Sequence, residues 1–375
     1  MSNLLEKIGF VFEDPYKRAK EEKSNGSKVI GITPMFFPQE IVHAANCVPV
    51  ILQASKEPIT LGFSHYHHFF CGLTRGIVDL AAKGKLDFID GLILSDMCFE
   101  MRHVADPLRR FRRFPVIHMQ WPLEANEERW LDFITGRLGK CVSKLEELSG
   151  NRIGDQNIEA SIRLYNKNRA LLRQIYELRK VKPGILSPKE MSALVISSMV
   201  TPVEENNKFL SQLIAELERL QPKVASDTRL ILSGHLCHEV KDGILDLIET
   251  MGGVVVGDDL YTGFRYYASD VDTNTPPMEA FARRYLNLKI PCPTRVDIKR
   301  DWAEFLIQSF KEQKAKGIIM ILAKNCEPHM IYYPYMKARL ESAGIPHILI
   351  QVEHEMVSLE GIRTRIQAFI EILRG

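Results

Sequence analysis

Short apolar runs and segments of helical spacing alternate along the first third of the chain. Helices are expected over residues 38–46, where proline stands in the first turn, and over residues 71–82. The apolar runs have the length of strands, and they cover residues 28–33, 48–52, 88–94 and 114–119. This alternation predicts a parallel sheet whose strands are joined by crossover helices.

The pattern changes between residues 126 and 220, where strand signals are sparse. Apolar positions there recur with the 3.6-residue period of a helix, as at Leu164, Leu171, Leu172, Ile175 and Leu178. This region is expected to form helices that pack on, or connect, two sheet domains.

The alternation of strands and helices returns in the last third of the chain. Helices are expected over 243–251 and 361–373, and strands over 229–234, 253–257, 317–322 and 347–350. The predicted fold class is therefore α/β, with two parallel-sheet domains and a helical connecting region. The expected boundaries are 1–125 for the N-terminal α/β domain, 126–223 for the helical region and 224–375 for the C-terminal α/β domain.

Composition and charge narrow the class of protein. The 375 residues are 45% hydrophobic and 26% charged, with a formal net charge of +2. Bulk charge therefore gives no argument for binding to nucleic acid or to a membrane surface. No apolar stretch approaches the ~20 residues of a membrane span, and the first residues are polar rather than a signal-peptide core. A cytoplasmic protein is expected.

Seven cysteines are the most informative chemical feature of this chain. A cytoplasmic setting disfavours disulfides, which leaves buried thiols, catalytic thiols or metal ligands. There is no Cys-x-x-Cys pair, so a zinc ribbon or a ferredoxin-type cluster loop is not expected.

Four of the cysteines stand at positions suited to a shared site. Cys98, Cys237 and Cys326 each lie a few residues past a predicted strand, and the crevice outside such strand ends is where open parallel sheets bind ligands. Cys71 begins a predicted helix, where the helix dipole favours a thiolate. A packed thiol is the alternative for any one of them, but metal ligation is favoured for the group. The other three, Cys47, Cys141 and Cys292, are interpreted as packed thiols.

Several stretches together resemble the family of 2-hydroxyacyl-CoA dehydratase and benzoyl-CoA reductase subunits. They occur in order along nearly the whole chain: Pro-Gln-Glu-Ile-Val-His-Ala-Ala from 38, Phe-Cys-Gly-Leu-Thr-Arg from 70, the segment 88–98, Lys-Asn-Cys-Glu-Pro from 324, and the end from Gly-Ile-Pro-His at 344. The family implies two Rossmann-like domains with a [4Fe–4S] cluster in the crevice between them. Its three cysteine ligands map onto Cys71, Cys98 and Cys326.

The resemblance also implies partners and a reaction. The family implies a homologous second catalytic subunit, an acyl-CoA substrate and a separate ATP-hydrolysing iron–sulfur activator protein. This sequence itself contains no P-loop. In the family, anaerobic radical chemistry passes an electron from the cluster to the thioester carbonyl.

One segment distinguishes the branches of the family. Residues 233–239, Ser-Gly-His-Leu-Cys-His-Glu, resemble the smaller of the benzoyl-CoA reductase subunits, and the likeness includes Cys237. A fourth cysteine ligand would close one iron and suit an electron relay. A reductase of an aromatic acyl-CoA such as benzoyl-CoA is therefore expected, with His235, His238 and His329 as proton donors.

Three alternatives to the benzoyl-CoA reductase stay open. The chain could be the small subunit of a radical 2-hydroxyacyl-CoA dehydratase, since a cluster with three cysteines leaves one iron open. It could hold a double-cubane [8Fe–9S] cluster, because extra cysteines are available. It could also be a cluster scaffold or carrier that is not an enzyme.

Overall fold

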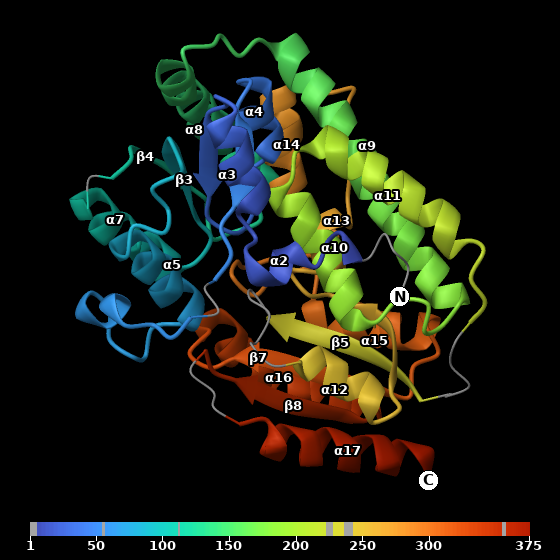
Figure 1. The fold of residues 1–375 in the computed structure, drawn as a ribbon. Coiled ribbons are helices and arrows are strands. Elements are labelled where there is room, and N and C mark those ends of the chain that lie inside the picture. Colours follow the sequence, from blue (N-terminus) through green and yellow to red (C-terminus); the bar gives the residue numbers. More distant parts are fainter. Residues whose placement is uncertain (1–5, 55–56, 112, 223–227, 236–242, 355–357) are drawn as a thin grey trace.

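The computed structural model describes residues 6–54, 57–111, 113–222, 228–235, 243–354 and 358–375. The predicted fold class is confirmed: the chain is α/β, with two four-stranded sheets in which every strand pairs in parallel. Figure 1 shows the N-terminal sheet and its helices above the C-terminal sheet, with long helices from the middle of the chain beside both.

The N-terminal sheet has the order β2-β1-β3-β4. Its strands are β1 (Val29–Ile32), β2 (Val48–Ile51), β3 (Gly91–Asp96) and β4 (Val116–Gln120). All residues of β1 and β3 are buried, as expected for central strands covered on both faces. The structure thus has the four strands that the apolar runs predict, with starts shifted by up to three residues.

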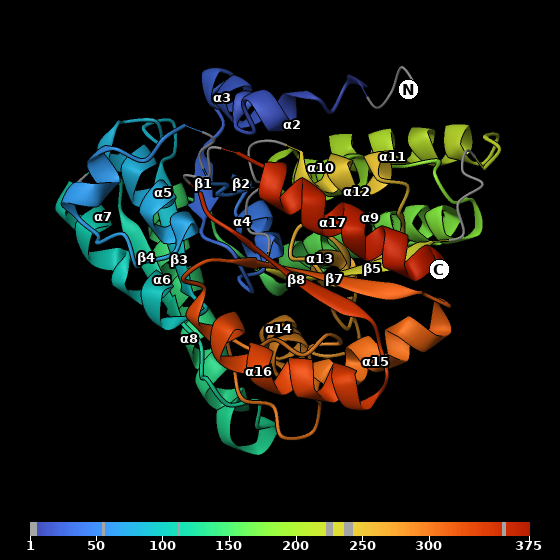
Figure 2. The same ribbon diagram turned by 90° about the horizontal axis from the view of Figure 1, so that it is seen from below.

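The C-terminal sheet repeats this plan with the order β6-β5-β7-β8. Its strands are β5 (Arg229–His235), β6 (Val254–Asp258), β7 (Gly317–Ala323) and β8 (His347–Val352). Apolar side chains of α12 and α17 cover one face of this sheet, and those of α15 and α16 cover the other. Figure 2 shows α17 and the pair α15 and α16 on opposite sides of β7 and β8.

The predicted helical region is also observed. It consists of α8 (Glu127–Ser149), α9 (Asp155–Val181), α10 (Pro188–Val200) and α11 (Val203–Leu217). Local capping explains where α10 begins: Ser187 Oγ accepts from Glu190 N at 3.1 Å, and Glu190 Oε2 accepts from Ser187 N at 2.8 Å. The left-handed Gly150 ends α8.

The remaining helices lie at both ends of the chain. Those before α8 are α2 (Phe10–Glu13), α3 (Lys17–Ser24), α4 (Gln39–Ala44), α5 (Gly72–Ala82), α6 (Phe99–His103) and α7 (Ala105–Phe111), with a 3₁₀ turn η1 (Leu61–Ser64). Those after α11 are α12 (Ile244–Thr250), α13 (Phe264–Tyr267), α14 (Pro277–Leu286), α15 (Trp302–Glu312), α16 (Glu327–Ser342) and α17 (Glu360–Arg374).

The hydrophobic core connects the two sheet regions. One cluster contains the N-terminal sheet, the middle helices and side chains between residues 261 and 292, including those of α14. Tyr285 of α14 stacks on Trp121 with ring centroids 4.4 Å apart, so this stretch of the C-terminal half packs on the N-terminal half. The domain boundaries at 125 and 223 stay a prediction.

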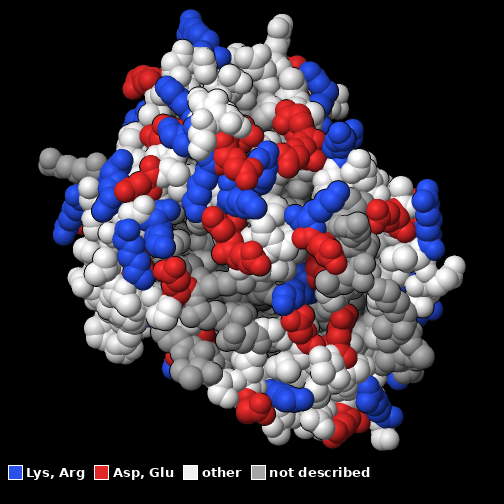
Figure 3. Space-filling model, viewed as in Figure 1, with Lys and Arg blue, Asp and Glu red and all other residues white. Residues whose placement is uncertain are grey.

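Two surface features bear on the expected class of protein. On the face drawn in Figure 3, Lys and Arg side chains are interspersed with Asp and Glu among the described residues. Within the described ranges, no helix is both long enough and apolar enough to cross a bilayer.

Candidate metal centre

Three of the predicted ligand cysteines stand at the starts of three helices. Cys71 precedes α5, Cys98 precedes α6 and Cys326 precedes α16. Cys98 lies two residues after β3, and Cys326 lies three residues after β7. Facing loops of the two sheets thereby bring the three thiols to one cavity of about 380 Å³.

The structure brings together only part of the predicted site that it describes. Cys71, Cys98, Cys326 and His235 line the cavity, and His329 contacts Cys326. Cys237 and His238 lie outside the described residues. The ligand and proton-donor roles of all these residues stay a prediction.

Burial makes the three thiols hard to ionise without a cation. It raises the pKa of Cys98 to about 12 and raises those of Cys71 and Cys326 further. Mutual repulsion adds to this, because negative charges on Cys71 and Cys98 raise the pKa of Cys326. Three thiolates in one buried cavity therefore need a compensating positive charge, which bound iron would supply.

Glu100 is a carboxylate in the same cavity that sequence reasoning missed. Its Oε2 accepts from Cys71 N at 2.7 Å and lies 3.5 Å from Thr74 Oγ1. Burial raises the pKa of Glu100, and its charge raises the pKa of all three thiols. Its position two residues after Cys98, in the first turn of α6, was the only signal in the sequence.

A buried acid holds the strand end behind Cys98. Asp96 Oδ1 accepts from Trp121 N at 2.9 Å, and Asp96 Oδ2 lies 3.0 Å from Arg102 Nε and 3.1 Å from His118 Nε2. These contacts join the ends of β3 and β4 to α6. They fix the backbone that presents Cys98 to the cavity.

Two buried histidines lie on the C-terminal side of the cavity. His235 is the last residue of β5, and His329 is in the first turn of α16. His329 Nδ1 is 3.2 Å from Cys326 Sγ, and the two imidazole rings have centroids 4.8 Å apart. Burial lowers the pKa of His235 to about 4 and that of His329 well below its usual value, so both rings are neutral at neutral pH.

Cys292 lies nearer to this site than its sequence context indicated. Its Sγ is 3.1 Å from Thr294 Oγ1, and Thr294 lines the cysteine cavity. A negative charge on Cys292 would raise the pKa of Cys98, so the two thiols are neighbours. By contrast, Cys47 and Cys141 are packed in the core of the N-terminal half.

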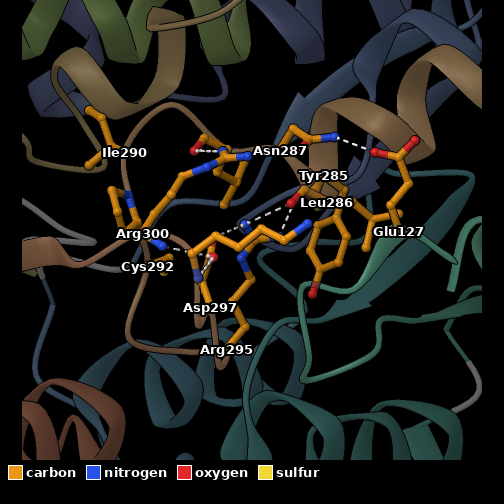
Figure 4. A network of polar contacts seen from close by, with 12 residues as sticks. Glu127, Tyr285, Leu286, Asn287, Ile290, Cys292, Arg295, Asp297 and Arg300 are labelled. Carbon is orange, nitrogen blue, oxygen red and sulfur yellow. Dashed lines mark hydrogen bonds and ion pairs between the residues drawn. The ribbon is translucent and has the colours of Figure 1, made fainter. Parts of the chain in front are cut away.

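Arginines fix the loop that carries Cys292, as Figure 4 shows. Arg295 donates to the carbonyl oxygens of Tyr285 and Leu286. Arg300 donates to Leu288 O at 2.6 Å and to Asn287 Oδ1 at 2.7 Å. The loop after α14 is therefore tied to the end of that helix.

A second cavity of about 930 Å³, part of it open to solvent, lies beside the first. Its walls are mainly aromatic, and they include Phe36, Phe37, Tyr165, Tyr261, Tyr266, Phe281 and Tyr285. Four cationic side chains also line it: Arg169, Arg265, Arg284 and Lys289. This aromatic cavity was not predicted, because its residues come from distant segments without a shared motif.

The cations of the aromatic cavity differ in their partners. Arg169 Nη1 pairs with Glu40 Oε1 at 2.9 Å, and Arg265 Nη2 lies 3.5 Å from Asp259 Oδ2. The buried Nε of Arg284 has no hydrogen-bond partner among the described residues. Burial, with repulsion from Arg169, lowers the pKa of Arg284 to about 10, and the guanidinium stays charged at neutral pH.

Arg265 and the histidines connect the two cavities. Arg265 lines the aromatic cavity and donates to the carbonyl oxygens of Ile290 and Pro291. Its charge lowers the pKa of both His235 and His329. The histidine pair therefore lies between the cysteine cavity and the aromatic cavity.

Comparison with known proteins identifies the family. Residues 34–373 match the family described as 2-hydroxyglutaryl-CoA dehydratase, D-component. The (R)-phenyllactyl-CoA dehydratase beta subunit of Clostridium sporogenes is 28% identical over 97% of this chain and 96% of its own length. A benzoyl-CoA reductase subunit from Thauera aromatica is 25% identical over 99% and 96%, respectively. The resemblance seen in the sequence is confirmed, and the chain belongs to the 2-hydroxyglutaryl-CoA dehydratase D-component family, whose relatives here are subunits of dehydratases and a reductase.

Proposed function

We propose that this chain is the iron–sulfur subunit of an enzyme that acts on an aromatic acyl-CoA, with reduction of a benzoyl-CoA-type substrate as the first candidate reaction. The observation that carries the proposal is the cavity lined by Cys71, Cys98 and Cys326. These three thiols would hold a [4Fe–4S] cluster, with Cys237 as the predicted fourth ligand.

The described residues fit such a cluster in donor type and in charge. Thiolates are its usual ligands, and the three thiols come from two sheets that face each other. No Lys or Arg lines this cavity among the described residues, so iron would provide the missing positive charge. When bound, the cluster would supply electrons at low potential. Glu100 and Asp96 would hold the loops that carry Cys71 and Cys98.

The aromatic cavity supports the choice of substrate. Its aromatic walls suit an aryl group, and the Arg284 guanidinium offers a hydrogen-bond donor to an acyl carbonyl. Two relatives carry an aromatic acyl group in their names, phenyllactyl and benzoyl. His235 and His329, between the cavities, remain the proposed proton donors together with His238.

A 2-hydroxyacyl-CoA dehydratase is the second candidate function. It is favoured by the relative that dehydrates (R)-phenyllactyl-CoA and by the three described thiols, which would leave one iron of the cluster open for a substrate oxygen. The proximity of Cys292 to Cys98 keeps a larger [8Fe–9S] cluster as a further form of the site.

The proposed partners follow from the same relatives, which are named as subunits. We expect a homologous second catalytic subunit and an ATP-hydrolysing iron–sulfur activator, in the cytoplasm. An isolated scaffold or carrier would need neither partner to bind its cluster and would bind no acyl-CoA.

The test is anaerobic turnover of the complete system, with chain, second subunit, activator and ATP. ATP-dependent ring reduction of benzoyl-CoA is the expected result. Dehydration of (R)-phenyllactyl-CoA without ring reduction would transfer the chain to the dehydratase function. Binding of neither acyl-CoA by a complex that retains its iron would contradict both candidates.

A further inference from the structure

Cys326 belongs to two different sets of metal-binding side chains. One set is the three cysteines described above. The other consists of His235, Cys326 and His329, whose ligand atoms all lie within 4.8 Å of one another and whose side chains are all buried. His235 ends β5, whereas Cys326 and His329 start α16, so the adjacent ends of two paired strands assemble this second set.

The geometry of this second set is close to that of a mononuclear site. Zinc bound at about 2.3 Å from sulfur and about 2.0–2.1 Å from nitrogen places tetrahedral S and N ligands about 3.6 Å apart. The observed separation between Cys326 Sγ and His329 Nδ1 is 3.2 Å, and no pair of ligand atoms exceeds 4.8 Å. The Cys-x-x-His spacing places both ligands in the first turn of one helix.

The surroundings hold the two imidazoles in place. Gly234 has φ +117°, and a Cβ there would come within 2.3 Å of Ile321 O, so only glycine allows this approach to His235. Asp259 Oδ1 accepts from Gly234 N at 3.0 Å. The His329 ring packs edge-on against Trp302, with centroids 5.4 Å apart.

The protonation states of these groups also favour a metal. Both imidazoles are neutral at neutral pH, because burial lowers their pKa values, and neutral imidazole is the ligating form. Burial raises the pKa of the Cys326 thiol, so this thiol ionises only when a cation is bound beside it.

We propose that His235, Cys326 and His329 form a site for one Zn²⁺ ion in the chain that lacks its cluster. Mixed imidazole and thiolate ligands suit this ion, and three protein ligands leave a fourth position for water or another donor. The thiolate of Cys326 serves one metal centre at a time. Zinc at this site therefore blocks assembly of a cluster on Cys71, Cys98 and Cys326.

The site can be tested without the cluster. In the Cys71→Ser/Cys98→Ser double variant two cluster ligands are removed and the proposed zinc ligands remain. Titration with Co²⁺, a spectroscopic substitute for Zn²⁺, should give one ion per chain with a sulfur-to-cobalt charge-transfer band. Adding His235→Ala or His329→Ala should abolish the band at equimolar Co²⁺. His347→Ala, at the start of β8, is the matched control and should leave the band unchanged.

Thermal unfolding provides a second readout that also shows whether each variant is folded. Zn²⁺ should raise the melting temperature of the double variant and leave that of the His329→Ala derivative unchanged. A folded double variant without a charge-transfer band would overturn the proposal. So would a band that persists in both histidine variants, because other ligands would then hold the ion.

The competition with the cluster is tested in the wild-type chain. One equivalent of Zn²⁺, added before anaerobic reconstitution, should reduce iron uptake by most of its value, and His235→Ala/His329→Ala should remove this inhibition. Equal inhibition in the histidine variant would overturn the competition. This inference does not rest on the proposed function: a wild-type chain that never takes up iron would contradict that function and leave the Co²⁺ result standing.

Discussion

The two neighbouring cavities stabilise opposite charges. The cysteine cavity is lined by three thiols and by Glu100 and Glu327, with no Lys or Arg among its described lining residues. The aromatic cavity is lined by four cationic side chains, of which Arg284 has a buried Nε without a partner in the described part of the chain. The first is therefore suited to a cation such as iron, and the second to a ligand with a carbonyl or anionic oxygen.

Their different origins explain this contrast. The cysteines lie at the starts of helices beside the ends of β3 and β7, where parallel sheets ordinarily place ligands. The aromatic cavity combines the segment after β1 with side chains of α9 and of α13 and α14. One site follows from sheet topology, and the other from the packing of helices between the two halves of the molecule.

The largest expected effect is on the cysteine cavity. Replacing Cys71, Cys98 or Cys326 by serine should each cause near-complete loss of iron and of the visible absorbance of the cluster, because one strong ligand is removed. Iron analysis after anaerobic purification measures this. Cys141→Ser, in the core of the N-terminal half, is the control and should keep its iron. Retention of iron in all three cavity variants would show that the cluster lies elsewhere.

The aromatic cavity should respond to Arg284→Met. Loss of a charge-assisted hydrogen bond of about 1.5–3 kcal/mol predicts a benzoyl-CoA dissociation constant raised by on the order of 10-fold or more. Calorimetric titration of the assembled complex measures it, and iron content should not change. Arg283→Met is the matched control, since Arg283 pairs with Glu127 and Glu279 instead. Equal affinities for both variants would exclude Arg284 from the binding site.

Glu100 sharpens the account of the cysteine cavity. Glu100→Ala removes the acceptor of the Cys71 N–H bond, so Cys71 is held less firmly and iron release to a chelator should accelerate on the order of 10-fold. Glu327→Ala changes an exposed acid that lines the same cavity and should release iron at the wild-type rate. Identical rates for both variants would show that the contact with Cys71 N does not matter for the cluster.

The smallest expected effect concerns Asp258, at the end of β6 before the loop that lines the aromatic cavity. Burial raises the pKa of this carboxyl above its unfolded value. The native state therefore binds more protons, and the stability that the protonated carboxyl contributes is lost as pH rises from about 3.9 through the folded pKa. Urea unfolding of Asp258→Asn should show a weaker fall in stability over this range than the wild type. An unchanged slope would show that Asp258 does not titrate differently in the two states.

The sequence predicted strands well because their apolar runs are short and bounded by polar or glycine-containing segments. All eight observed strands overlap predicted runs. Helices α14 to α16 were missed, since residues 277–342 carry proline inside and beside their helical segments. Cys71, Cys98 and Cys326 could be singled out because strand ends are visible in sequence.

Other parts of the sites have no such local signal. Glu100 reaches the cavity only because α6 turns back toward Cys71. Arg284 meets Tyr165 and Phe36 only after three distant segments pack together. Cys292 was interpreted as a packed thiol, and its proximity to Cys98 depends on a loop that arginines hold to the end of α14.

The central claim is that three cysteines from facing loops hold a [4Fe–4S] cluster. Iron and sulfide analysis with electron paramagnetic resonance of the anaerobically purified wild-type chain tests it most directly. The account predicts about four iron and four sulfide per chain and the signal of a reduced [4Fe–4S] centre after dithionite. Less than about one iron per chain after anaerobic reconstitution, with no such signal, would contradict it.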